Sequence, residues 1–247
     1  MNDKSHEWQR LNVEFATVDG TVLRGWHYAQ AARGRPVIVM SHGTGATKEM
    51  GLDLTAADFA NAGYNCLVYD HRNLGESDGA VRQHIDPWQQ VADGRDAITF
   101  ARNMEGVDGN RLALWGTSLS GGHALVLGAT DRRIRAVVAQ GCTISGWRNA
   151  QRRQPGDLWR TMSERFAADR DTSFRGEPLA LTPQNPDVTA DDVAHVPGPD
   201  EVFVIGNSFK QWARSMAPAA MARWPNQLTL RTYENYRSYE PGGCISR

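Results

Sequence analysis

The chain has 247 residues, a length that fits one α/β domain with a sizeable core. Its 27 lysines and arginines against 28 acidic residues leave a formal net charge of -1, so no overall field favours nucleic acid or an anionic membrane. The three cysteines form neither a disulfide framework nor a metal-binding cluster, and the polar N-terminus lacks the apolar run of a signal peptide. We expect a cytoplasmic protein with no metal, no nucleic-acid partner and no membrane span.

The first part of the chain predicts a hairpin followed by the strands of a parallel sheet. Residues 11–28 form the pattern of a strand, an Asp19-Gly20 turn and a second strand, which is typical of a hairpin. Short, continuous apolar runs follow, as expected of strands that are buried on both faces. These runs span residues 37–40, 66–69, 112–115 and 136–139.

Helical segments separate these runs. One spans residues 54–62, and a second begins at Asp86-Pro87, where aspartate is a good N-cap and proline fits the first helical position, and continues to residue 102. A third helix is expected directly after Ser118. This order predicts the α/β class: a mostly parallel sheet with an N-terminal antiparallel hairpin and helices on both faces.

The composition changes near residue 146. The following thirty or so residues (146–175) are rich in arginine, a proline-rich stretch comes next, and residues 208–224 are amphipathic. We predict that residues 1–146 form the core and that residues 147–247 form a helical, loop-rich insertion or cap over the active site. The arginines fit either an anion-binding surface or a solvated helix face with ion pairs, and the second interpretation is favoured.

The stretch 112–122 places a serine at a tight turn between a strand and a helix. A nucleophile elbow has this arrangement, and it needs small residues two positions before and after Ser118, which Gly116 and Ser120 provide. The backbone N–H of Leu119 would then point to the place where an oxyanion forms. The alternative is a glycine-rich connection whose serines only cap the next helix.

A second turn with the composition of an oxyanion loop follows the first predicted parallel strand. It reads Ser41-His42-Gly43-Thr44-Gly45. In a hydrolase with a nucleophile elbow, the N–H at the position of Thr44 is the second oxyanion donor. A third motif, at residues 70–79, follows the next strand. The glycines of the second turn fit neither a P-loop nor a dinucleotide-binding fingerprint, so no cofactor is expected.

Together these motifs resemble the α/β-hydrolase superfamily. S-H-G-x-G, D-x-R-x-x-G-x-S-x-G and G-T-S-x-S-G-G occur in the order found in its dienelactone-hydrolase and bacterial esterase or peptidase-like branches, over residues 13–146. The resemblance implies the α/β-hydrolase fold with Ser118 as the nucleophile, and Ser120 stands where glycine is usual. It further implies that the oxyanion donors are Thr44 and Leu119. The residues that it implies as supporting ones are His42, Gly43, Gly45, Gly116 and Ser120.

A serine nucleophile needs a base, normally a histidine that a carboxylate orients. In this superfamily both follow the serine, and only His123 and His195 do so here. His123 lies within the helix after the serine and is expected to be a packed or capping histidine, whereas His195 lies in the insertion without a strand pattern. His71 and His84 are expected on loops near the site, outside the position that the superfamily uses.

Two explanations of the missing base remain open. In the first, the chain stops before the last two strands, which would carry the acid and the histidine. In the second, these motifs have decayed in place, since residues 202–207 resemble a strand that ends in asparagine and residues 242–244 resemble Gly-Gly-His with a cysteine. The first is favoured because residues 228–236 lack the apolar run of a final strand. It leaves the strand at 136–139 as an exposed edge, which predicts poor solubility or a homodimer.

The sequence therefore supports two functions. The first is an esterase-like serine hydrolase that acts on a carboxylic ester or related small acyl substrate through an acyl-enzyme on Ser118, with activity impaired by orders of magnitude where the base is lost. The second is a catalytically silent binding protein that keeps the pocket. Four tryptophans of the insertion fit either a lid for aryl or alkyl substrates or internal packing, and these are Trp147, Trp159, Trp212 and Trp224.

Overall fold

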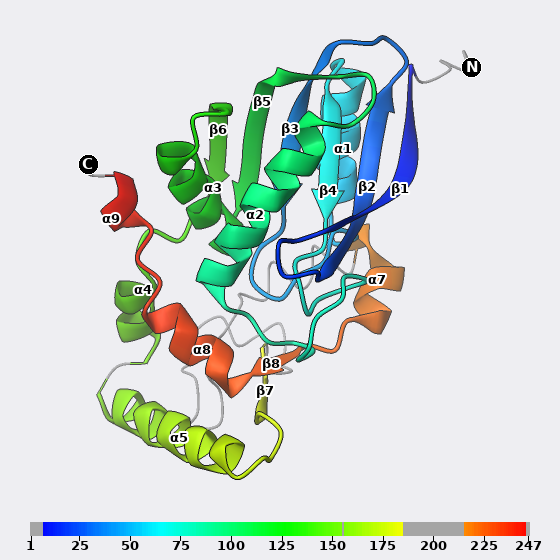
Figure 1. Cartoon of the computed structure of the whole chain (residues 1–247). Helices are drawn as coiled ribbons and strands as arrows, with labels where there is room; N and C mark the ends of the chain where they lie inside the picture. Colours follow the sequence, from blue (N-terminus) through cyan, green and yellow to red (C-terminus); the bar gives the residue numbers. More distant parts are fainter. Residues whose placement is uncertain (1–6, 155, 185–214, 246–247) are drawn as a thin grey trace.

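The computed structural model describes residues 7–154, 156–184 and 215–245 (Figure 1). A strand hairpin comes first, then alternating strands and helices, and then a mainly helical C-terminal part. The elements are β1 (Trp8–Ala16), β2 (Val22–Gln30), β3 (Arg35–Ser41), α1 (Leu52–Asn61), β4 (Asn65–Tyr69), α2 (Pro87–Arg102), β5 (Val107–Thr117), α3 (Leu119–Thr130), β6 (Ile134–Gln140), α4 (Gly146–Arg153), α5 (Asp157–Phe174), β7 (Leu181–Pro183), α7 (Pro218–Arg223), β8 (Gln227–Thr229), α8 (Leu230–Arg237) and α9 (Gly242–Ile245).

The central sheet has the strand order β1-β2-β4-β3-β5-β6. β2 pairs antiparallel with both β1 and β4, whereas the other neighbours are parallel. This confirms the predicted mostly parallel sheet with an N-terminal antiparallel hairpin. The short antiparallel pair of β7 and β8 is an addition that the sequence pattern did not predict.

Apolar clusters cover both faces of the sheet. On one face, α2 and α3 pack against side chains such as Val39 and Leu114. On the other face, α1 packs against Ile38 and Val68. Successive residues of a strand point to opposite faces, so a strand buried on both sides needs the continuous apolar runs that the sequence contains. Figure 1 shows α1 and α2 on opposite sides of the strands.

Local signals set the ends of these elements. The Asp86 side chain accepts hydrogen bonds from the N–H groups of Trp88 (2.9 Å) and Gln89 (3.2 Å), so Asp86 is the N-cap of α2 as predicted. Pro87 takes the first helical position. In the connection between β1 and β2, Gly20 adopts a φ of 84°, which fits the predicted role of the glycine in this turn.

The C-terminal part is mainly helical and shares the core of the sheet. Met162 and Phe166 of α5 and Tyr233 of α8 belong to the same apolar cluster as the residues under α2 and α3. The predicted boundary at residue 146 therefore crosses a continuous core, and it stays a prediction. Of the predicted amphipathic segment, the structure describes the part that contains α7.

β6 is the outermost strand of the sheet within the described residues. Ala136 and Val138 on this strand are exposed, as the sequence predicted for an edge. Residues 202–207 lie outside the described residues. Residues 230–237 form α8 rather than a strand, and no helix in the described ranges combines the length and apolar character needed to cross a membrane.

Candidate active site

Ser118 connects β5 to α3 in a strained backbone conformation. Its φ of 55° and ψ of -116° lie in a region that non-glycine residues rarely adopt. Two hydrogen bonds hold it there: Ser118 N–H donates to the carbonyl of Gln140 and the Ser118 carbonyl accepts from Thr143 N–H, both at 2.9 Å. A Cβ atom at Gly116 would collide with the backbone of Ser120. The turn therefore needs the small residues that the elbow pattern contains.

The turn after β3 lies directly against Ser118. A Cβ atom at Gly43 would stand 3.0 Å from Ser118 Cβ, so glycine permits this close approach. Other elements hold the carbonyls of the turn. Thr44 O accepts from the amide of Gln184 (2.5 Å), and Gly45 O accepts from the indole N–H of a tryptophan next to α7 (2.8 Å).

A pocket of about 500 Å³, here called the Ser118 pocket, opens at this junction. Its walls include both turns, an apolar side formed by Ala46, Met50, Leu52 and Trp115, and a polar side formed by Asn149, Arg153 and Tyr236. Trp147, Trp159 and Trp224 do not line it, and Trp147 instead packs edge to face on Trp159 with ring centroids 4.8 Å apart. Trp212 lies outside the described residues.

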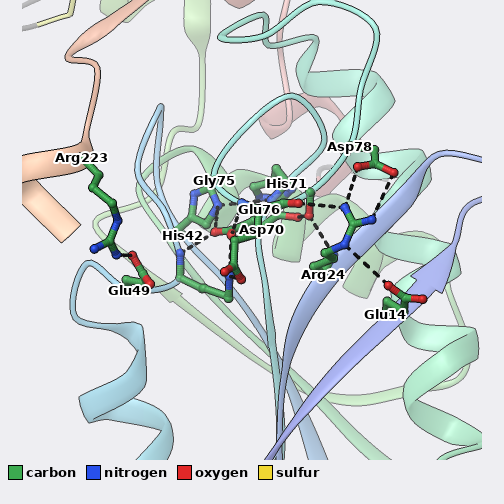
Figure 2. A network of polar contacts seen from close by, with 12 residues as sticks. Glu14, Arg24, His42, Glu49, Asp70, His71, Gly75, Glu76, Asp78 and Arg223 are labelled. Atoms are coloured by element: carbon green, nitrogen blue, oxygen red, sulfur yellow. Dashed lines mark hydrogen bonds and ion pairs between the residues drawn. The ribbon is translucent and has the colours of Figure 1, made fainter. Parts of the chain in front are cut away.

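Asp70, which follows β4, is a buried carboxylate that joins the segment after β3 to its own turn (Figure 2). One oxygen accepts from Lys48 N–H (2.7 Å), and the other accepts from Lys48 Nζ (2.7 Å) and Glu76 N–H (3.0 Å). Burial opposes the charge of Lys48, but the carboxylates of Asp70 and Glu76 outweigh it and raise the pKa of Lys48 above its ordinary value. Asp70 thus fixes the position of the segment after β3 through both the backbone and the side chain of Lys48.

Other residues of the predicted motif at 70–79 have structural contacts. A Cβ atom at Gly75 would collide with the Asp70 carboxylate, which explains the glycine. The Ser77 hydroxyl donates to the Asp70 carbonyl (2.6 Å). Arg72 forms a bidentate ion pair with the buried Asp93, at 2.5 and 2.6 Å. These contacts shape the loop, and none of these side chains lines the Ser118 pocket.

The Ser118 hydroxyl has no hydrogen bond to any of the five histidines that the structure describes. His84 contacts a threonine hydroxyl at 2.9 Å, and His27 contacts an asparagine at 3.2 Å. His195, the other downstream candidate, lies outside the described residues. The base that a serine nucleophile needs is therefore not among the described histidines.

His123 is packed below the elbow, as the sequence predicted. Its two ring nitrogens lie 2.7 Å from the Tyr239 hydroxyl and 3.0 Å from Gln90 Oε1. His71 lies edge to face between His123 and His42, with ring centroids 5.7 and 4.8 Å away. Burial lowers the pKa of all three imidazoles, that of His123 to about 3, so they are neutral at pH 7.

A comparison with protein families identifies the fold and this arrangement. The model of the α/β hydrolase fold matches residues 36–239. The chain belongs to the α/β-hydrolase family. The predicted fold class is thereby confirmed, and Ser118 occupies the strand-to-helix turn of an α/β hydrolase.

Curated relatives of this chain include a thiohydrolase and a polyketide transferase. A thiohydrolase of Aspergillus aculeatus is 41% identical over 139 residues, which are 56% of this chain and 43% of that protein. A polyketide transferase of a Penicillium species is 39% identical over 146 residues, 59% of this chain and 49% of that protein. The chain thus spans about half the length of the curated relatives that it matches.

Solved structures are similar to this structure over a larger part of the chain. The crystal structure of the α/β hydrolase GrgF from a Penicillium species is 32% identical, with a TM-score of 0.74 over 96% of this chain and 77% of that one. DcsB in complex with a substrate analogue is 26% identical, with a TM-score of 0.79 and the same coverage.

The structure of the hydrolase brings the predicted site residues together at one edge of the sheet. Their chemical roles stay predictions. Sequence reasoning missed three contacts here: the buried pair of Lys48 and Asp70, and the hydrogen bonds of Ser120 to His42 and to His71. The D-x-R-x-x-G pattern marked Asp70 as part of a motif but not as buried, and the position of Lys48 had no recognisable spacing.

Proposed function

We propose that this chain carries the nucleophile and oxyanion hole of a serine-dependent acyl hydrolase or acyltransferase. The observation that carries the proposal is the strained Ser118 at the mouth of the Ser118 pocket, with the Gly43 turn packed on its side chain. A strained conformation persists where the surroundings impose it, and such residues cluster at active sites. An ordinary helix-capping serine needs no such strain, and the Ser118 side chain makes no capping hydrogen bond to α3.

The oxyanion donors are the N–H groups of Thr44 and Leu119. Leu119 is the first residue of α3, where N–H groups have no acceptor within the helix and the helix dipole favours negative charge. Thr44 lines the same pocket from the turn that lies against Ser118. Donors fixed in this way stabilise the tetrahedral intermediate of acyl transfer, which typically contributes about 10²- to 10³-fold in rate for each donor.

A thioester is the acyl donor that we infer. The relatives named as thiohydrolase, acyltransferase and polyketide transferase support this class. Ser118 Oγ forms an ester bond to the acyl carbon while the C–S bond breaks, the serine proton passes to a base, and the electron pair leaves with the thiolate. Because a thiol has a pKa of about 8.5, this leaving group departs without a proton from the enzyme. Water or another hydroxyl then takes the acyl group.

A catalytically silent binding protein is the second candidate. It is supported by the hydrogen bonds of the described histidines, which go to partners other than Ser118. It predicts a ligand that binds equally well to the wild type and to Ser118→Ala, with no turnover in either protein.

A fluorophosphonate probe tests the first proposal. The wild-type chain is expected to be labelled at Ser118, and Ser118→Ala is expected to abolish the label. Ser238→Ala is the matched control, because this exposed serine on the C-terminal side of α8 donates only to the carbonyl of Asn235 (2.8 Å). An unlabelled wild-type chain, with the control also unlabelled, would leave the silent binding protein as the better account.

A further inference from the structure

Ser120 is a fully buried serine at a position where the elbow needs only a small side chain. Its hydroxyl oxygen lies 2.5 Å from the carbonyl oxygen of His42 and 2.8 Å from Nε2 of His71. The three residues come from different parts of the chain: Ser120 from the first turn of α3, and the two histidines from the turns after β3 and β4. One hydroxyl therefore contacts two turns that are distant in sequence.

The chemistry of the partners fixes the direction of each bond. A carbonyl only accepts, so the Ser120 hydroxyl donates to His42 O, and His71 must then donate from Nε2 to the Ser120 oxygen. The backbone N–H of His71 donates to His42 Nε2 (3.3 Å), so the His42 ring carries its proton on Nδ1 and donates it to Gly43 O (3.0 Å). One pattern of protons on neutral imidazoles satisfies these four hydrogen bonds, and it leaves His71 Nδ1 as a buried acceptor without a hydrogen-bond partner among the described residues.

The position of the His42 carbonyl matters for the oxyanion hole. His42 lies two residues before Thr44, and Ser120 directly follows Leu119. The two N–H groups of the proposed hole thus belong to separate turns, and the Ser120 hydroxyl bridges these turns beside both donors. A shift of about 1 Å in such donors is large enough to reduce the rate by roughly 10²-fold.

We propose that Ser120 is a positioning residue, which holds the turn of Thr44 against the elbow of Leu119 through its bond to His42, and that His71 orients the Ser120 hydroxyl. This inference rests on the proposed function, because it assigns a role in the same oxyanion hole. It also explains why serine stands at a position where glycine or alanine would satisfy the backbone. The buried hydroxyl contributes to the geometry of the hole as well as to stability.

The test compares Ser120→Ala and Ser120→Gly with the matched control Ser77→Ala. Ser77 is equally buried and its hydroxyl also makes two bonds, donating to Asp70 O (2.6 Å) and accepting from Arg24 N–H (2.9 Å), but it lies outside the Ser118 pocket. With an aryl thioester as substrate, the Ser120 variants are expected to lose roughly tenfold or more in kcat while KM changes less than twofold. Ser77→Ala is expected to keep kcat within twofold of the wild type while losing similar stability. Equal kcat in the wild type and both Ser120 variants would overturn the inference.

A structural measurement separates this inference from the proposed function. Crystal structures of the wild type, Ser120→Gly and Ser77→Ala are expected to show the turn at residues 42–45 displaced from Leu119 only in the Ser120 variant. If the wild type has no esterase or thioesterase activity, the proposed function fails, and these structures still decide the positioning role. An unmoved turn in Ser120→Gly would contradict that role.

Discussion

At the residue scale, Lys48 and Asp70 form an ion pair that is almost completely removed from solvent. Their side chains are each 1% exposed, whereas those of the surface pair Arg33 and Glu105 are 78% and 84% exposed. Removing one partner of a buried pair leaves an uncompensated charge in a medium that solvates it poorly. The turn at residues 42–48 depends on this pair, because Asp70 also accepts the backbone N–H of Lys48.

Replacing Lys48 by methionine is expected to lower the free energy of unfolding by about 3–5 kcal/mol, since Asp70 is then buried without a cation. Arg33→Met is the control, and it is expected to change the free energy by less than about 1 kcal/mol because exposed ion pairs contribute little. Urea unfolding measures both. Equal effects of the two substitutions would show that burial of the ion pair does not determine its contribution to the free energy of unfolding.

The buried histidines predict a dependence of stability on pH. The pKa of folded His123 is about 3, against an ordinary value of 6.5, so below pH 6.5 the unfolded chain binds a proton that the folded chain does not. Stability is therefore complete above pH 6.5 and falls as the pH drops toward 3. The expected loss is about 1.4 kcal/mol per pH unit for each such histidine.

Urea unfolding at pH 7 and pH 5.5 tests this expectation. In His123→Gln, the free energy of unfolding is expected to depend less steeply on pH, because unfolding takes up about one proton fewer. This holds even where the variant is less stable at both pH values. A wild-type stability that is unchanged between these two pH values would contradict the burial of neutral histidines.

At the element scale, the sequence predicted the features that depend on neighbouring residues. Continuous apolar runs located β3, β4 and β5, and the Asp86-Pro87 pair located the start of α2. The elbow was predictable because strand, small residues and helix follow one another within a dozen positions. The contacts of Ser120 with His42 and His71 were not, because they span 78 and 49 residues and have no local pattern.

The contact between the residue after α7 and the turn after β3 is another long-range feature. Trp224, which follows α7, donates its indole N–H to Gly45 O (2.8 Å) across 179 positions of sequence. Trp224→Phe is expected to lower kcat by roughly fivefold, the effect of losing one neutral hydrogen bond of about 1 kcal/mol at the turn. Trp147→Phe is the control, since Trp147 is 47% exposed and does not line the pocket. Equal kcat values for the two variants in a thioester assay would contradict a role of α7.

At the scale of the whole molecule, the exposed edge of the sheet is the feature that bears on association between copies of this chain. β6 is the last strand of the sheet in the described part of the chain, and Val138 on it is 48% exposed. An uncovered edge presents unpaired backbone groups to another strand. We therefore propose that these 247 residues self-associate through β6.

Sedimentation of the wild type and of Val138→Lys tests this proposal. Lysine on an edge strand opposes pairing, so the variant is expected to sediment as a monomer while the wild type forms dimers or larger species. Ala92→Lys, at an exposed position of α2, is the control and is expected to associate like the wild type. A monomeric wild type would contradict association through this edge.

The described residues bring the elbow and the turn after β3 together without placing a histidine at Ser118. The family comparison covers residues 36–239, which contain both turns, and the described histidines bond elsewhere. Curated relatives are about twice as long as the matched region. We therefore propose that this chain provides the nucleophile and the oxyanion donors of an acyl-transfer site.

The most direct test is the intact mass of the chain after incubation with an aryl thioester, followed by peptide mapping. Our account predicts a mass increase equal to one acyl group, located on the peptide that contains Ser118 and absent from Ser118→Ala. A chain that remains unmodified, or that carries the acyl group on a residue other than Ser118, would contradict it.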